Sequence, residues 1–137
     1  MLGVDLGARR IGLARSDPSG TLASPVSVLE RSGDREADHR AILDAAREAG
    51  ADRIVVGLPI SLSGDEGPAA RGVRDELHEL RAAAGDELII EAHDERFTTV
   101  TANRALAQAG HRGTARRQSI DAAAAAVMLQ SWLEAQA

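Results

Sequence analysis

The sequence contains no cysteine, no tyrosine and no lysine, and its 137 residues include only two aromatic side chains, Phe97 and Trp132. Without cysteine the chain has no disulfide, no thiolate zinc site and no cysteine nucleophile, which is typical of a reducing compartment. The hydrophobic fraction is 44%, so the core must be built from alanine, leucine, valine and isoleucine. Any catalysis must therefore use carboxylates, hydroxyls, histidines or a bound metal ion.

The formal net charge is −5, and every one of the 16 basic residues is arginine. A negative balance argues against a non-specific coat for nucleic acid, although a local cluster of arginines can still bind phosphate. No run approaches the roughly 20 apolar residues of a membrane-spanning helix, and the first residues lack the pattern of a signal peptide. We therefore expect a cytoplasmic protein without membrane association.

The length indicates one domain over residues 1–137. Apolar runs bounded by turn residues predict five strands, at 2–6, 11–14, 21–29, 54–58 and 88–90. Helical periodicity predicts helices at 34–49, 68–85, 98–109 and 119–135, and a basic loop is expected at 113–117. Tight early connections predict an antiparallel meander, and strands alternating with helices predict parallel crossovers. The fold class is therefore α/β, a mixed five-stranded sheet with helices on both faces.

Acidic side chains from distant parts of the sequence can meet at one edge of this sheet. Asp5 lies within the apolar first strand, Asp94 and Glu95 follow the last strand, and Asp121 lies on the last helix. Since neighbours in an extended chain point to opposite faces, we expect only one of Asp94 and Glu95 to face Asp5. Structural alternatives exist for each: closing a turn for Asp5, capping a helix for the Asp94-Glu95 pair, and a first-turn position for Asp121.

Carboxylates that crowd together repel each other, and burial adds a further cost to each ionised form. Mg²⁺ or Mn²⁺ removes this cost, since hard divalent cations prefer oxygen ligands. Two such ions roughly 4 Å apart can activate a water molecule and stabilise the leaving oxygen of a phosphodiester. The pattern therefore predicts a metal-dependent site that cuts phosphodiesters. His93, beside the acidic pair, could assist proton transfer, although a structural hydrogen bond is the simpler interpretation.

The same map brings arginines to both sides of the carboxylates. Arg9 and Arg10 follow the first strand, and Arg112, Arg116 and Arg117 precede Asp121. Planar guanidinium groups suit phosphate oxygens, and each such contact makes binding salt-dependent. For any single arginine a solvated surface position is the plainer alternative. As a set, these five side chains are predicted to bind nucleic acid.

Several short motifs stand in order along almost the whole chain. They are Gly3-Val4-Asp5-Leu6-Gly7, Arg10-Ile11-Gly12, Ser16-Asp17, Val56-Gly57-Leu58-Pro59, Gly64-x-x-Gly67-x-x-Ala70, Asp94-Glu95-Arg96-Phe97-Thr98-Thr99, and Ile120-Asp121-x-Ala123-Ala124 with Leu129-Gln130. As a set they resemble the YqgF (RuvX) family. The resemblance implies an RNase H-like fold related to Holliday-junction resolvases, and an endonuclease that matures the 5′ end of pre-16S rRNA in ribosome biogenesis.

On this resemblance, Asp5, Glu95 and Asp121 fall on the acidic positions of the family, and they are the expected catalytic residues and ligands of Mg²⁺ or Mn²⁺. Two features depart from the pattern. Resolvase relatives carry an acidic residue on the strand that follows the first helix, whereas residues 54–58 contain none. The basic segment before Asp121 typically includes lysine, and here it is Arg116-Arg117-Gln118-Ser119.

Other functions remain as alternatives. The same chemistry would serve a resolvase of branched DNA, for which a homodimer is possible because two strands are cut symmetrically. A ribosome-assembly or nucleic-acid-binding factor with vestigial carboxylates would bind RNA without a divalent metal. Actin-like ATPases also begin with an Asp-x-Gly strand and turn, but they require two such domains, and no triad supports a serine hydrolase.

Overall fold

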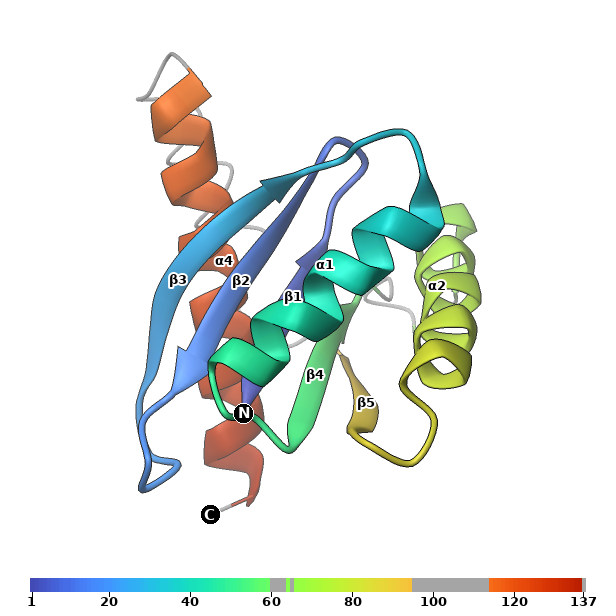
Figure 1. Cartoon of the computed structure of the whole chain (residues 1–137). Coiled ribbons are helices and arrows are strands. Elements are labelled where there is room, and N and C mark those ends of the chain that lie inside the picture. Colours follow the sequence, from blue (N-terminus) through green and yellow to red (C-terminus); the bar gives the residue numbers. More distant parts are fainter. Residues whose placement is uncertain (60–63, 65, 95–113, 137) are drawn as a thin grey trace.

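The computed structural model describes residues 1–59, 64, 66–94 and 114–136, and along them strands and helices follow the expected order (Figure 1). The strands are β1 (Leu2–Leu6), β2 (Arg10–Ser16), β3 (Ala23–Glu30), β4 (Arg53–Leu58) and β5 (Ile89–Asp94). The helices of the described residues are α1 (Arg35–Glu48), α2 (Pro68–Ala84) and α4 (Thr114–Gln136). The five strands and the helices predicted at 34–49, 68–85 and 119–135 are confirmed, whereas the one predicted at 98–109 lies outside the described residues.

The strands form one mixed sheet in the order β3-β2-β1-β4-β5. β2 pairs antiparallel with both β1 and β3, whereas β1 with β4 and β4 with β5 are parallel pairs. The predicted meander followed by parallel crossovers is therefore confirmed. Because β1, β4 and β5 run in the same direction, their carboxyl ends lie at one edge of the sheet, together with the turn from β1 to β2. We call this the carboxyl edge.

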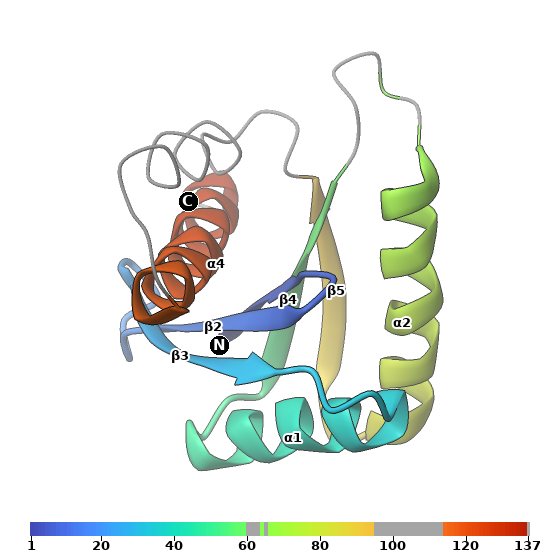
Figure 2. The same cartoon turned by 90° about the horizontal axis from the view of Figure 1, so that it is seen from above.

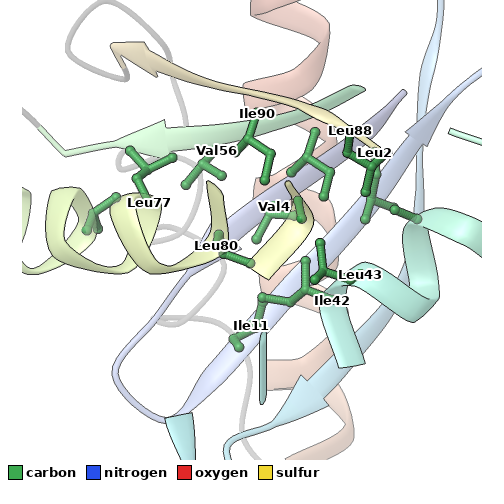
Figure 3. Close-up of a cluster of buried hydrophobic side chains, with 14 of the residues drawn as sticks. Leu2, Val4, Ile11, Ile42, Leu43, Val56, Leu77, Leu80, Leu88 and Ile90 are labelled. Atoms are coloured by element: carbon green, nitrogen blue, oxygen red, sulfur yellow. The ribbon is translucent and has the colours of Figure 1, made fainter. Parts of the chain in front are cut away.

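Helices cover both faces of the sheet, α1 and α2 on one side and α4 on the other (Figure 2). Side chains alternate between the two layers. Val4 belongs to the core under α1 and α2 (Figure 3), while Gly3 faces α4, where an added Cβ would lie 2.8 Å from the Cβ of Leu129. In β4, Val56 joins the first core and Val55 the second, so this strand is buried on both faces, as its unbroken apolar run predicted.

The local sequence explains where the first two helices begin and end. The Asp34 carboxylate caps α1 by accepting hydrogen bonds from the backbone N–H groups of Glu36 and Ala37, at 3.1 and 3.4 Å. α2 begins with Pro68, whose missing N–H costs nothing in a first turn. The helix ends at Gly85, which has a φ of 61° that residues with a Cβ rarely adopt.

The last helix is longer than the sequence predicted. α4 begins at Thr114, so the loop expected over 113–117 is wrong for residues 114–117, where alanine and arginine favour helix. Asp121 consequently lies in the second turn, and its interpretation as a first-turn residue at the helix N-terminus is wrong. None of the helices in the described residues combines the length and the apolar composition needed to cross a membrane.

Candidate active site

Asp5 is a buried carboxylate on the central strand. It is 8% exposed and lies one residue before the end of β1, at the carboxyl edge. In the β1–β2 register Asp5 stands opposite Gly12. Val4 faces the core under α1 and α2, and therefore Asp5 and Gly12 lie on the opposite face, which α4 covers.

Gly12 allows α4 to lie directly against the sheet beside Asp5. A Cβ at this glycine would collide with the backbone carbonyl group of Asp121. Residues opposite each other in an antiparallel pair have Cβ positions only about 4.5–5.5 Å apart. The topology thus brings Asp5 and Asp121, from opposite ends of the sequence, to the same small region of one face.

Asp121 forms an ion pair with the first residue of β2. The Nε of Arg10 donates to Oδ2 of Asp121 at 2.6 Å, and the two side chains are 18% and 15% exposed. The sequence predicted Arg10 as a phosphate-binding residue and did not predict this contact. The guanidinium therefore places a positive charge beside the Asp121 carboxylate, on the face of the sheet that Asp5 shares.

The turn between β1 and β2 carries Arg9 and Arg10, and backbone contacts keep it tight. The N–H of Gly7 donates to the carbonyl oxygen of Arg10 at 3.0 Å, and the N–H of Arg31 donates to that of Arg9 at 2.9 Å. An added Cβ on Gly7 would meet the Arg10 carbonyl, so the turn closes only around a glycine. Arg9 is exposed at the carboxyl edge, which suits its predicted contact with phosphate.

Neighbouring residues at the end of β5 lie on opposite faces of the sheet. Asp94 shares the strand face of Ile90 and Ala92, which pack into the core under α1 and α2. His93 lies on the opposite face, where its Nε2 and the hydroxyl oxygen of Ser131 on α4 are 3.0 Å apart. Burial lowers the pKa of His93, against a smaller opposing effect of the Asp94 charge. The hydrogen bond agrees with the structural interpretation of His93.

Several of the predicted site residues are not covered by the structure. Glu95 and Arg112 lie outside the described residues. Arg116 and Arg117 belong to the first turns of α4, but their side chains are not described. Within the described part of the chain no group of three or more acidic, histidine or cysteine side chains is arranged to hold a metal ion. Asp5 and Asp121 are the two predicted ligands that the described structure contains.

The Ser16-Asp17 motif has a structural explanation. The Asp17 carboxylate accepts hydrogen bonds from the hydroxyl of Ser19 at 2.7 Å and from the backbone N–H groups of Leu22 and Thr21 at 3.1 and 2.8 Å. These bonds hold the pKa of Asp17 far below its usual range. The residue closes the turn that leads into β3, at the end of β2 remote from the carboxyl edge.

Sequence reasoning gave no role to two features that shape this site. Gly12 appeared only as part of a motif, although a glycine within a strand is a known sign of close backbone approach. Arg31 and Glu76 carried no signal at all, because they lie far apart in the sequence and form their ion pair only in the folded chain. Glu76 also stands in a regular helical pattern, where a glutamate is normally exposed.

The fold is shared with solved Holliday junction resolvases. The structure of Thermus thermophilus RuvC in complex with a Holliday junction substrate matches with a TM-score of 0.60 at 18% identity, covering 98% of this chain and 93% of that chain. The fowlpox virus resolvase in its complex with Holliday junction DNA matches with a TM-score of 0.56 at 11% identity, covering 99% of each chain. The protein is therefore an RNase H-like domain of the kind found in these resolvases.

The sequence comparisons narrow this class to one family. The RuvX family model, described as Holliday junction resolvase, matches residues 1–135. A relative from Mycobacteroides abscessus is 44% identical over 136 residues, covering 97% of this chain and 80% of the relative. A relative from Nocardioides sp. is 45% identical over 135 residues, covering 97% of this chain and 86% of the relative. Both are named "Putative pre-16S rRNA nuclease". The chain belongs to the RuvX family, as its motifs predicted.

Proposed function

We propose that the chain is a metal-dependent endonuclease that hydrolyses phosphodiester bonds in structured RNA and processes the 5′ end of pre-16S rRNA during ribosome biogenesis. The name of the curated relatives supports precursor rRNA as the substrate. Membership of the RuvX family and the resolvase-like fold support phosphodiester hydrolysis. The activity resides in one domain, residues 1–137, and takes place in the cytoplasm.

The catalytic residues in this proposal are Asp5, Glu95 and Asp121, which also bind Mg²⁺ or Mn²⁺. The observation that supports it most strongly is the approach of α4 to β2 at Gly12, because the Asp121 backbone lies against the residue that stands opposite Asp5. Carboxylate oxygens are the ligands that both ions prefer, so the donor set fits either of them.

Glu95 is the better candidate for the third ligand than Asp94. Asp94 has the strand parity of Ile90 and Ala92, which pack on the face opposite to Asp5. If the chain stayed extended, the side chain after Asp94 would point to the other face, the one that Asp5 shares with His93, which contacts α4. This parity supports Glu95 in the assignment that the family resemblance implies.

Each residue then has a chemical task. A divalent ion bound at this edge supplies an activated water and stabilises charge on the leaving oxygen. Asp5 and Asp121 would hold such an ion through their carboxylate oxygens. Arg10 keeps the Asp121 carboxylate oriented through the Nε–Oδ2 contact. Arg9, Arg10, Arg112, Arg116 and Arg117 are the proposed contacts to the phosphate backbone, whose charge their guanidinium groups would neutralise.

Branched DNA is the second candidate substrate. The family description names Holliday junction resolvases, and the solved structures of similar fold are resolvases. A resolvase would act as a homodimer so that two strands are cut symmetrically. The two substrates place the same demands on the carboxylates, and only a direct comparison separates them.

The test compares wild type, Asp5→Asn and Asp86→Asn on a precursor rRNA fragment and on a four-way DNA junction, each with Mn²⁺ and with chelator. Asp86 is an exposed aspartate between α2 and β5, so its variant is a control for the loss of one charge. We expect cleavage of the RNA by wild type and Asp86→Asn, and a loss of about 100-fold or more in Asp5→Asn and in chelator.

Each other outcome is informative. Preferential cleavage of the junction, with a dimer in solution, would support the resolvase. Cleavage that persists in both Asp5→Asn and chelator would falsify the metal-dependent mechanism. RNA binding without cleavage, equal in the presence and absence of Mn²⁺, would support a non-catalytic ribosome-assembly factor.

A further inference from the structure

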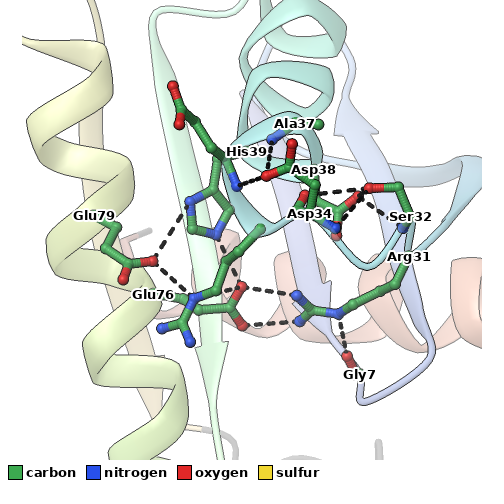
Figure 4. A network of polar contacts seen from close by, with 11 residues as sticks. Gly7, Arg31, Ser32, Asp34, Ala37, Asp38, His39, Glu76 and Glu79 are labelled. Atoms are coloured by element: carbon green, nitrogen blue, oxygen red, sulfur yellow. Dashed lines mark hydrogen bonds and ion pairs between the residues drawn. The ribbon is translucent and has the colours of Figure 1, made fainter.

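A bidentate ion pair joins Glu76 of α2 to Arg31, the residue that follows β3 (Figure 4). Nη1 and Nη2 of Arg31 donate to Oε1 and Oε2 of Glu76, each at 2.8 Å. His39 of α1 adds a third contact, with its Nε2 2.8 Å from Oε1 of Glu76. The Glu76 side chain on α2 thus contacts both the residue that follows β3 and a residue of α1.

Glu76 is buried and Arg31 is partly buried, and burial makes this pair an expensive way to connect two elements. Glu76 is 7% exposed, and the Arg31 side chain is 18% exposed. A hydrophobic pair of similar volume often gives equal or greater stability, so a buried ion pair is weak evidence for a stabilising role. One well-attested use of such pairs is to select a single arrangement of the groups that they contact.

The third nitrogen of Arg31 reaches the turn that follows Asp5. Its Nε donates to the carbonyl oxygen of Gly7 at 2.9 Å, while its backbone N–H donates to that of Arg9 at 2.9 Å. Arg31 therefore holds two of the three residues between β1 and Arg10. Its guanidinium orientation is itself fixed by the fork that it forms with Glu76.

The same turn determines where Arg10 points. Arg10 ends the turn, accepts a hydrogen bond from the N–H of Gly7, and directs its Nε to Oδ2 of Asp121. Among the described residues, the Asp121 carboxylate accepts this hydrogen bond through Oδ2 only. A single-point contact fixes the carboxylate while leaving its Oδ1 lone pairs for a second cation.

We propose that Arg31 and Glu76 are positioning residues for the candidate active site, fixing the Gly7–Arg10 turn so that Arg10 orients the Asp121 carboxylate. The chain of contacts runs from Glu76 through Arg31, the turn and Arg10 to Asp121. This role rests on the proposed function, because it describes how a metal ligand is held. Partners that orient ligating carboxylates commonly change metal affinity by about 10- to 100-fold when they are removed.

The first experiment measures the orientation of Arg10 in metal-free protein, independently of any activity. The Nε–H signal of Arg10 is observed by ¹⁵N NMR and assigned as the signal lost in Arg10→Gln. We expect Glu76→Gln and Arg31→Lys to speed the exchange of this Nε–H with water several-fold, because the ion pair to Asp121 is no longer aligned. Arg31→Lys keeps the charge beside Glu76 but lacks the fork and the third nitrogen.

The second experiment measures Mn²⁺ affinity in a double-mutant cycle. Arg10→Gln is expected to weaken Mn²⁺ binding by about 10-fold, and Glu76→Gln by a smaller factor. In the Arg10→Gln background, Glu76→Gln should have no further effect, because its influence passes through Arg10. A pair that merely joins α2 to the sheet would give additive losses instead.

Glu87→Gln is the matched control. Glu87 also forms a two-point pair with an arginine, through Nε and Nη2 of Arg47 at 2.9 and 3.1 Å, but the pair is exposed and has no contact with the turn. The control should preserve both the Arg10 signal and the Mn²⁺ affinity.

The outcomes separate this inference from the proposed function. An unchanged Arg10 signal in folded Glu76→Gln and Arg31→Lys overturns the positioning role, whether or not the protein binds Mn²⁺. Equal changes in Glu87→Gln overturn it as well. Faster exchange in the two variants, combined with no Mn²⁺ binding by wild type, supports the positioning of Arg10 and counts against the metal-dependent nuclease.

Discussion

The residue that brings the candidate carboxylates together has no side chain. Gly12 stands opposite Asp5 in the sheet, and the Asp121 carbonyl occupies the space where its Cβ would be. Gly3 plays a similar part farther along the helix, against Leu129. The separation of Asp5 and Asp121 is thus set by how closely α4 can approach the strands. That approach requires glycine, with no Cβ, at positions 3 and 12.

Gly12→Ala should therefore destabilise the protein by about 1–3 kcal/mol, because a methyl group forces the α4 backbone away from β2. The control is Gly72→Ala, at an exposed position of α2 where an added Cβ meets nothing within 4 Å. It should stabilise by about 0.5–1 kcal/mol, since alanine is the better residue in a helix. Urea unfolding of both variants gives the two free energies, and equal changes of one sign would contradict the close approach at Gly12.

At this scale the sequence predicted the charged residues better than the neutral ones. Asp5 and Asp121 were expected to converge because strand order and helix position follow from hydrophobic pattern, and the structure brings them to one face. Their catalytic role stays a prediction. The ion pair of Arg10 with Asp121 could not be predicted, since it depends on the direction of one side chain at the start of a strand.

Among the elements, α2 is tied to the rest of the fold by a charged residue as well as by its apolar face. Burial raises the pKa of Glu76, but the hydrogen bonds and charges of Arg31 and His39 outweigh burial and leave this pKa below its ordinary value. The same contact raises the pKa of Arg31. The two shifts agree that the ionised pair is the favoured form in the folded chain.

This lowered pKa predicts how stability depends on pH. The Glu76 contribution is fully present above the ordinary carboxyl pKa of 4.5 and is lost as the pH falls through the lower value of the folded state. Glu76→Gln should cost about 3–5 kcal/mol at neutral pH, because Arg31 is left without its charged partner. As the pH falls below 4.5 the difference between variant and wild type should shrink, because Glu76 takes up its proton in the unfolded chain first and in the folded chain only at its lower pKa.

Urea unfolding at several pH values measures this difference. Hydrogen bonds from Ser32 also lower the pKa of Asp38, but Asp38 is present in both proteins and so does not contribute to the difference between them. Glu87→Gln is the exposed comparison and should differ little from wild type at any of these pH values. A difference for Glu76→Gln that is constant down to the lowest pH would contradict the assignment.

Element boundaries show where pattern reasoning reaches its limit. The apolar run of β4 identified a strand buried on both faces, since no other element needs such a run. The start of α4 was misplaced because arginines were taken as loop residues, whereas a helix accepts them on its exposed side. β5 continues through the polar residues Glu91 and His93. These residues belong to the strand because they pair with β4, and the sequence of β5 alone does not predict that pairing.

For the whole molecule, a net charge of −5 sets a condition on any nucleic-acid partner. The overall field repels a polyanion, so binding must depend on local positive charge, which the proposed function assigns to the carboxyl edge. There the exposed Arg9 lies next to the Asp5 strand and the Arg10–Asp121 pair, whereas α1 and α2 cover the face opposite to that site. The position of each arginine therefore matters more than the total charge.

Arg9→Gln should weaken binding of a precursor rRNA fragment and reduce the slope of log K against log salt by about 1, because one phosphate contact is lost. The control is Arg40→Gln, which removes the same charge from an exposed position on α1. It should leave the salt slope unchanged and alter affinity only slightly through the long-range field, which physiological salt screens within about 8 Å. Titrations at several salt concentrations, in Ca²⁺ to prevent cleavage, measure both slopes. If the two variants lowered the slope equally, RNA binding would depend on net charge alone. That outcome would contradict the carboxyl edge as the nucleic-acid-binding surface.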